Sequence, residues 1–214
     1  MKRIVSFFLL IMVLVFLSAC GETEPASVDE IPSEPSQAEL TDQLQSSTTY
    51  DVETLMSDNF YLLDTVVSDR EEANIYATKQ FTVEEIVDVV SETIPPDETS
   101  EKKDNQQILI YPNHFVTFKQ SEEDAQVTLI EVATDTFVRN NYSPNYLNGF
   151  FTYLMLDRML STNNWGQNRQ NQCTGGSCYG GYRTGTKTFG GGVTTNRTNR
   201  GLSSIRGGGP SAGK

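Results

Sequence analysis

The stretch "QILIYPNHFVTFKQSEEDAQVTLIEVA" (residues 107–133) decides the fold class, because it divides into three successive strands. Its first segment, "QILIY" (107–111), is apolar on both faces, which is typical of a strand in the middle of a sheet. The dipeptide "PN" makes a turn into residues 114–120, and "SEEDA" makes a second turn into residues 126–133. Loops this short join neighbouring strands, so the stretch predicts an antiparallel meander.

Helix signals flank the meander on both sides. Before it, Thr82 and Glu85 form a capping box, the apolar positions that follow share one helical face, and two prolines end the helix. After it, Ser143 caps a second helix, which is predicted over residues 143–160 and is apolar around much of its circumference. The second helix is therefore expected to be well buried.

Weaker patterns complete the predicted domain. A short helix is indicated near residues 52–57, and residues 59–67 and 74–81 have the composition of strands. The order strand, strand, helix, three strands, helix predicts an α+β domain over residues 47–165. We expect a small, mostly antiparallel sheet with helices on one face.

The chain begins with a leader of two basic residues and an apolar run over residues 4–17. At about 1.5 Å per residue this run spans roughly 21 Å, less than the roughly 30 Å of a bilayer core, and the length is typical of a secretory signal peptide. The sequence "LSAC" (17–20) resembles the lipobox of bacterial lipoproteins. The resemblance implies a diacylglyceryl group on Cys20 and removal of residues 1–19; the alternative is an ordinary signal peptide.

Both flanks of the predicted domain lack the apolar pattern of a folded core. Residues 20–46 are rich in Glu, Pro, Ser and Gln, which predicts an acidic, disordered tether that holds the domain off the lipid surface. Residues 166–214 contain 14 of the 16 glycines and predict a flexible, basic, low-complexity tail. The net charge is −21 over residues 21–165 and +7 over residues 166–214, within a total of −12.

Cys173 and Cys178 enclose the sequence "TGGS" near the start of this tail. In an exported protein such a pair predicts a small disulfide loop, with two free thiols as the alternative. A disulfide-exchange motif would have two intervening residues, whereas this pair has four. Two thiols with no nearby His or further Cys do not complete a metal site, so neither a metal nor another cofactor is expected.

Candidate catalytic residues are sparse in the sequence. The only histidine, His114, follows the predicted "PN" turn. It is interpreted as a strand-end residue, because the sequence spacing indicates no nucleophile or carboxylate as its catalytic partner. Phosphate loops, nucleophile elbows and zinc-binding helix motifs do not occur in the sequence. A non-enzymatic protein is therefore expected, and the alternative is an envelope hydrolase that uses a pair of carboxylates across a cleft.

The basic tail suggests a binding function, because its cations are interleaved with aromatic residues and glycines. Its seven basic residues are Arg169, Arg183, Lys187, Arg197, Arg200, Arg206 and Lys214. Outside the membrane, the expected partners are anionic lipids or wall polymers rather than nucleic acid. The alternative is that the tail folds back on the acidic part of its own chain.

The segment "FVRNNYSPNY" (137–146) places four hydrogen-bonding side chains ahead of the last predicted helix. It is interpreted as a structural joint, with a recognition surface as the alternative. The longer stretch "FVRNNYSPNYLNGFF", the lipobox, the acidic tether and the Arg/Gly-rich end together resemble an uncharacterised family of small lipoproteins of Gram-positive bacteria, known as a domain of unknown function. The resemblance implies no catalytic residue.

These observations predict where the protein is located and what it does. We expect a lipoprotein anchored by the diacylglyceryl group of Cys20 at the extracytoplasmic face of the cell membrane. There it would bind cell-envelope components or a membrane partner protein. An apolar patch on the last helix would favour a role as a subunit of a membrane complex.

Overall fold

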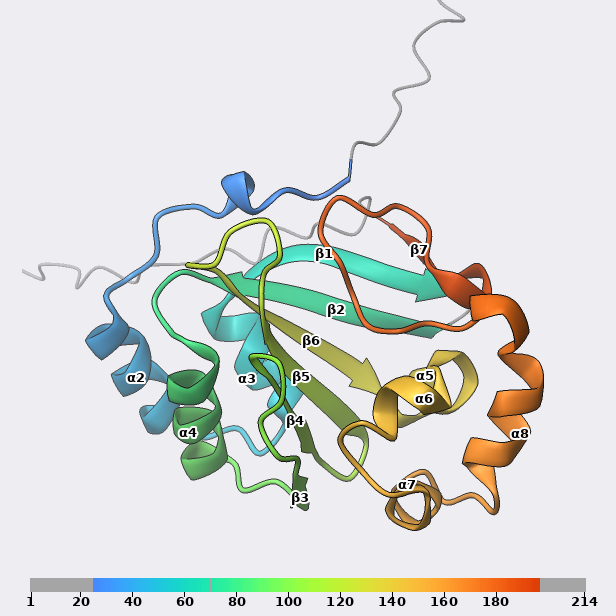
Figure 1. Cartoon of the computed structure of the whole chain (residues 1–214). Coiled ribbons are helices and arrows are strands. Elements are labelled where there is room, and N and C mark those ends of the chain that lie inside the picture. Colours follow the sequence, from blue (N-terminus) through green and yellow to red (C-terminus); the bar gives the residue numbers. More distant parts are fainter. Residues whose placement is uncertain (1–24, 70, 197–214) are drawn as a thin grey trace, which may run out of the picture.

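The computed structural model describes residues 25–69 and 71–196, and Figure 1 shows their arrangement around one sheet. Within the described residues, the sheet has seven antiparallel strands in the order β3-β4-β5-β6-β2-β1-β7. The strands are β1 (Tyr61–Ser68), β2 (Glu71–Thr78), β3 (Glu98–Thr99), β4 (Gln106–Ile110), β5 (His114–Gln120), β6 (Thr128–Thr134) and β7 (Thr194–Thr195). The predicted α+β class is therefore confirmed, together with its antiparallel sheet.

The predicted meander is present as β4, β5 and β6, which pair consecutively. Ile108, Leu109 and Ile110 are all buried, because successive side chains point to opposite faces and both faces of the sheet are covered. Strand β6 then pairs with β2, so the β1–β2 hairpin joins the meander at its far edge. The strand expected at 74–81 begins and ends three residues earlier, at Glu71 and Thr78.

Three helices cover one face of the sheet: α2 (Gln37–Ser46), α3 (Val52–Asn59) and α4 (Val83–Thr93). The capping box predicted at the start of α4 is confirmed, since the Thr82 hydroxyl accepts from the N–H of Glu85 and the Glu85 carboxylate accepts from the N–H of Thr82. Helix α2 also begins with a capping box, formed by Ser36 and Glu39. These helices and the adjacent sheet face form one apolar cluster.

The N-terminal tether was predicted to extend to residue 46, and this boundary is wrong for residues 25–46. Leu40 and Leu44 of α2 are buried in the cluster with α3 and α4. Further upstream, Ala26 and Val28 are 2% exposed and belong to the cluster on the other face of the sheet. A few well-placed apolar residues therefore fix a segment whose overall composition is that of a disordered chain.

The second face of the sheet is covered by the C-terminal part of the chain, which lies to the right in Figure 1. It contains the helices α5 (Asp135–Asn141), α6 (Pro144–Leu147), α7 (Tyr153–Met159) and α8 (Trp165–Gln172). The prediction placed helices on one face only, but the structure has them on both. The sequence signal for this second layer is weak because α5 to α8 are only four to eight residues long.

The single helix predicted over residues 143–160 is two helices. Helix α6 ends after one turn at Leu147, and the Thr152 hydroxyl accepts from the N–H of Met155 to begin α7. The apolar stripe continues across the break, which explains why its periodicity resembled one helix. The apolar residues of α7 include Leu156, which is fully buried, and Leu154, which is 82% exposed.

We call residues 173–196 the C-terminal strap, because this segment crosses the second face of the sheet and ends beside β1. The strap buries four large side chains, Tyr179, Tyr182, Phe189 and Val193. At its end, the N–H of Asn196 donates to the carbonyl oxygen of Thr65 over 2.7 Å. The prediction of a flexible tail over residues 166–214 is therefore wrong for residues 166–196.

A buried carboxylate fixes the strap to the sheet. Glu131 of β6 is 2% exposed and accepts hydrogen bonds from the hydroxyls of Tyr142 and Tyr179 over 2.8 and 2.7 Å. Its second oxygen accepts from the N–H of Tyr182 over 3.2 Å. Burial, assisted by the charge of Glu131, holds the pKa of both Tyr142 and Tyr179 well above the ordinary value, so both remain donors.

Candidate functional site

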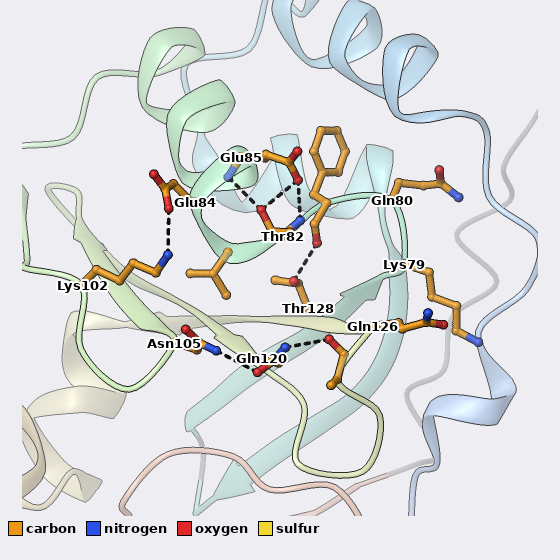
Figure 2. Close-up of a pocket in the computed structure, with 13 residues that line it drawn as sticks. Lys79, Gln80, Thr82, Glu84, Glu85, Lys102, Asn105, Gln120, Gln126 and Thr128 are labelled. Carbon is orange, nitrogen blue, oxygen red and sulfur yellow. Dashed lines mark hydrogen bonds and ion pairs between the residues drawn. The ribbon is translucent and has the colours of Figure 1, made fainter.

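A pocket of about 370 Å³ lies at one end of the sheet, between the first turn of α4 and the loops that join the strands (Figure 2). Most of its lining side chains are polar, so we call it the polar pocket. They come from the end of β2, the start of α4, the segment before β4 and the β5–β6 loop. The lining residues are Lys79, Gln80, Phe81, Thr82, Val83, Glu84, Glu85, Lys102, Asn105, Gln120, Ala125, Gln126 and Thr128.

The wall formed by α4 carries the two carboxylates of the pocket. Glu85 is held in the capping box, and hydrogen bonds from Thr82 lower its pKa. Glu84 pairs with the Lys102 ammonium over 2.8 Å, and this contact lowers the pKa of Glu84 (Figure 2). Both carboxylates are therefore ionised and partnered near neutral pH.

The opposite wall is a chain of side-chain amides. The amide of Asn105 donates to Gln120 over 2.9 Å, and the amide of Gln120 donates to the carbonyl oxygen of Ala125 over 2.7 Å (Figure 2). Between the walls, the hydroxyl of Thr128 donates to the carbonyl oxygen of Phe81 over 2.7 Å. These hydrogen bonds fix the orientation of the amide groups. The amide atoms that are not used in them therefore point in defined directions.

The lining of the polar pocket offers charged groups and hydrogen-bonding groups to a ligand. Two lysines and two glutamates balance in charge, and four side-chain amides supply both donors and acceptors. The volume falls in the range of small-ligand sites. The arrangement suits a ligand rich in hydroxyl or amide groups, such as a sugar or a short peptide segment.

A second pocket, of about 400 Å³, lies under the strap and is lined by Lys119, Glu122, Arg183 and the backbone of several glycines. The Lys119 ammonium donates to the carbonyl oxygen of Tyr182, and burial lowers the pKa of Lys119. Because this ammonium is already engaged and lies near Glu131, the pocket offers fewer groups to a ligand than the polar pocket does.

The sequence-predicted cysteines meet as expected: Cys173 and Cys178 form a disulfide at the start of the strap. Of the basic residues assigned to polyanion binding, Arg169 is engaged within the fold. Its guanidinium donates to the carbonyl oxygen of Tyr142 over 3.3 Å and to Gln172 over 2.7 Å. Arg183 and Lys187 are exposed on the strap. The lipid-attachment residue and the other basic residues, Cys20, Arg197, Arg200, Arg206 and Lys214, lie outside the described residues.

His114 is the first residue of β5, in agreement with its interpretation as a strand-end residue. The structure adds a partner that spacing did not reveal: Nε2 of His114 is 3.1 Å from the carboxylate of Glu53 on α3, and this hydrogen bond lowers the pKa of Glu53. The amide of Asn74 also donates to this carboxylate. These contacts tie α3 to the sheet, away from the polar pocket.

The residues 137–146 behave as a structural joint, which was the favoured interpretation. Asn140 and Asn141 both donate to the carboxylate of Glu71, over 2.7 and 3.0 Å. Tyr142 donates to Glu131, as described above. The side chains are thus used to connect α5 to the sheet.

The sequence did not reveal the polar pocket, since its amides and lysines belong to no motif. The signal that could have found it is positional: Gln120 and Gln126 lie at the facing ends of consecutive predicted strands. Within residues 25–69 and 71–196, no cluster of three or more His, Cys, Asp or Glu side chains could hold a metal ion. The same ranges include no helix with the length and apolar character needed to cross a membrane.

The fold and the pocket define the class of protein: an α+β domain with one antiparallel sheet, layers on both faces and a polar pocket at one end. The family model described as "Domain of unknown function (DUF4247)" matches residues 42–210, and the chain belongs to this family. The expected membership of an uncharacterised family is thus confirmed. The match includes the whole strap. No curated protein and no solved structure matches the chain.

Proposed function

We propose that the protein is a lipoprotein of a Gram-positive envelope, anchored at the outer face of the membrane through Cys20. There it binds, without catalysis, a hydroxyl- and amide-bearing part of a wall polymer. The leader and the "LSAC" sequence support the anchor. The polar pocket, with four side-chain amides lining a volume of about 370 Å³, is the observation that carries the binding function.

The ion pair at the edge of the pocket favours ligand entry. Lys102 and Glu84 have side chains that are 41% and 69% exposed, and exposed pairs of this kind contribute little to stability. A polar ligand group can therefore replace either partner at small cost. The pocket can accept a neutral sugar through its amides and a charged substituent through Lys102.

The alternative function, an envelope hydrolase, needs one carboxylic acid with a raised pKa and a second free carboxylate. The pKa values of Glu84 and Glu85 are both lowered, and both groups are partnered. The buried Glu131 accepts three hydrogen bonds beneath the strap. These assignments favour binding over acid–base chemistry as the role of the polar pocket.

The test measures, by calorimetry, the affinity of soluble wall fragments for the mature chain. The substitution Cys20→Ser removes the lipid-attachment site so that the chain can be studied in solution. Gln80→Ala and Gln126→Ala each remove an amide that lines the pocket, and each is expected to weaken binding about three- to tenfold. The control is Gln45→Ala, on the exposed surface of α2, which leaves the affinity unchanged. Absence of binding by the unsubstituted chain, or equal loss in the control, would contradict the proposal.

A second candidate function is polyanion binding by the C-terminal end. Arg183 and Lys187 are exposed, and residues 197–214 contain four basic and no acidic residues. Truncation after Asn196 removes those four cations and keeps the strap. If this end binds, truncation reduces sedimentation with anionic wall polymer, and added salt weakens the binding of the full chain. Unchanged sedimentation would rule out this second function.

A further inference from the structure

The distance between the proposed lipid anchor and the folded domain is short. Ala26 and Val28 are 2% exposed and packed in the core, so the domain begins about six residues after Cys20. Six residues span at most about 22 Å even when fully extended. A tether that ran to residue 46, as the composition predicted, would reach up to about 90 Å.

The place where the chain enters the domain is fixed by two hydrogen bonds. The carbonyl oxygen of Ala26 accepts from the N–H of Gly185 in the strap over 3.3 Å. The hydroxyl of Ser27 donates to the carboxylate of Glu123, in the β5–β6 loop, over 2.8 Å. We call the surface formed by residues 25–28, the β5–β6 loop (121–127) and residues 183–185 the entry face.

We infer that the entry face is turned toward the bilayer that holds the lipid of Cys20. The inference rests on the proposed lipid anchor and adds an orientation to it. A chain of at most about 22 Å places its point of attachment, Ala26, beside the headgroups. The opposite end of the sheet is farther away by the length of β5, seven residues or about 23 Å.

The charge of the entry face does not attract it to an anionic bilayer. The β5–β6 loop contributes three acidic residues, Glu122, Glu123 and Asp124, and the strap contributes one basic residue, Arg183, which lines the second pocket together with Glu122. The length of the chain, rather than electrostatic attraction, therefore limits the distance from the membrane. Lengthening the connection lets the domain leave the surface.

The orientation has a consequence for the polar pocket. Ala125 and Gln126 belong both to the β5–β6 loop and to the lining of the pocket. Lys79 also lines the pocket, and its N–H donates to Glu34 of the N-terminal segment over 2.7 Å. The pocket is thus on the membrane side of the domain, where it meets envelope components that are themselves attached to the lipid surface.

The experiment uses the full lipidated chain in vesicles of phosphatidylcholine with one-tenth phosphatidylglycerol. A photoreactive benzophenone side chain replaces Ala125 in one protein and Asn113, in the β4–β5 turn, in the other. Both positions are exposed, and they lie at opposite ends of β5. Lipid adducts are expected at least fivefold more often from position 125 than from position 113. Equal yields, or a higher yield from position 113, would overturn the orientation.

A length variant completes the experiment. Inserting 20 Gly and Ser residues after Glu22 is expected to bring the two yields together, since the connection then reaches about 90 Å. Yields that stay unequal would show that another contact sets the orientation, and the inference would be wrong. The mass of the reconstituted protein separates the two proposals: a chain without lipid contradicts the anchor and the orientation, whereas a lipidated chain with equal labelling contradicts the orientation alone.

Discussion

At the scale of single residues, Glu131 shows how a charged group can organise a core. Its carboxylate accepts three hydrogen bonds, two from tyrosine hydroxyls and one from the backbone of the strap. The cost of burying this charge is offset only while all three donors are in place. The residue therefore specifies one arrangement of α5, the strap and β6, which apolar packing alone would fix less tightly.

We predict that Glu131→Ala lowers the free energy of unfolding by about 3 kcal/mol or more, because three buried donors lose their acceptor. The measurement is urea denaturation followed by circular dichroism. The control is Glu92→Ala, on the exposed face of α4, with an expected change of less than about 0.5 kcal/mol. A loss at position 131 as small as that of the control would mean that the carboxylate does not hold the strap.

At the scale of residues, the sequence was sufficient to predict features whose residues lie close together in the chain. The capping box of Thr82 and Glu85 spans three residues, and the signal is complete within them. Glu131 lies within the predicted strand 126–133, but its partner Tyr179 is 48 residues away in the sequence. Gln126 of the polar pocket similarly acquires its role only when α4 and the β5–β6 loop come together.

At the scale of elements, the strands of the meander and helix α4 were predictable, and the strap was not. The meander consists of short, largely apolar runs separated by turn sequences, and this pattern is detectable in the sequence. The strap has irregularly spaced aromatic anchors between glycines, and this composition resembles that of a disordered tail. The same reason applies to residues 25–46, where two leucines decide the packing of a ten-residue helix.

The glycines of the strap are required at particular positions. A Cβ on Gly190 would lie 2.7 Å from the carbonyl oxygen of Gly176 and collide with that of Cys178. We predict that Gly190→Ala destabilises the protein by about 1–3 kcal/mol and makes the strap susceptible to limited proteolysis. Gly180→Ala, which meets no atom within 4 Å, is the control. Equal resistance of the two variants would contradict the close contact.

At the scale of the whole molecule, the sheet needs both of its layers. The cluster on the second face includes Leu63, Ile75 and Phe115 of the sheet and the aromatic residues of the strap. Removing the strap exposes this apolar face to water, which costs about 25 cal/mol for each Å² uncovered. The domain boundary at residue 165, which composition suggested, would therefore divide a single folding unit.

We predict that a chain ending at Trp165 unfolds without a cooperative transition or aggregates, whereas a chain ending at Asn196 melts within a few degrees of the full chain. The difference follows from the buried residues between the two end points. Thermal denaturation followed by circular dichroism is the measurement. Cooperative melting of the shorter chain near the temperature of the full one would show that the strap is dispensable.

The central claim is that Cys20 carries a lipid and holds the domain at the outer membrane surface. The most direct measurement is mass spectrometry of the N-terminal peptide of the protein extracted from native membranes. The predicted result is a peptide that begins at Cys20 and carries the added mass of a diacylglyceryl group. A peptide that retains residues 1–19, or one with an unmodified cysteine, would contradict the account.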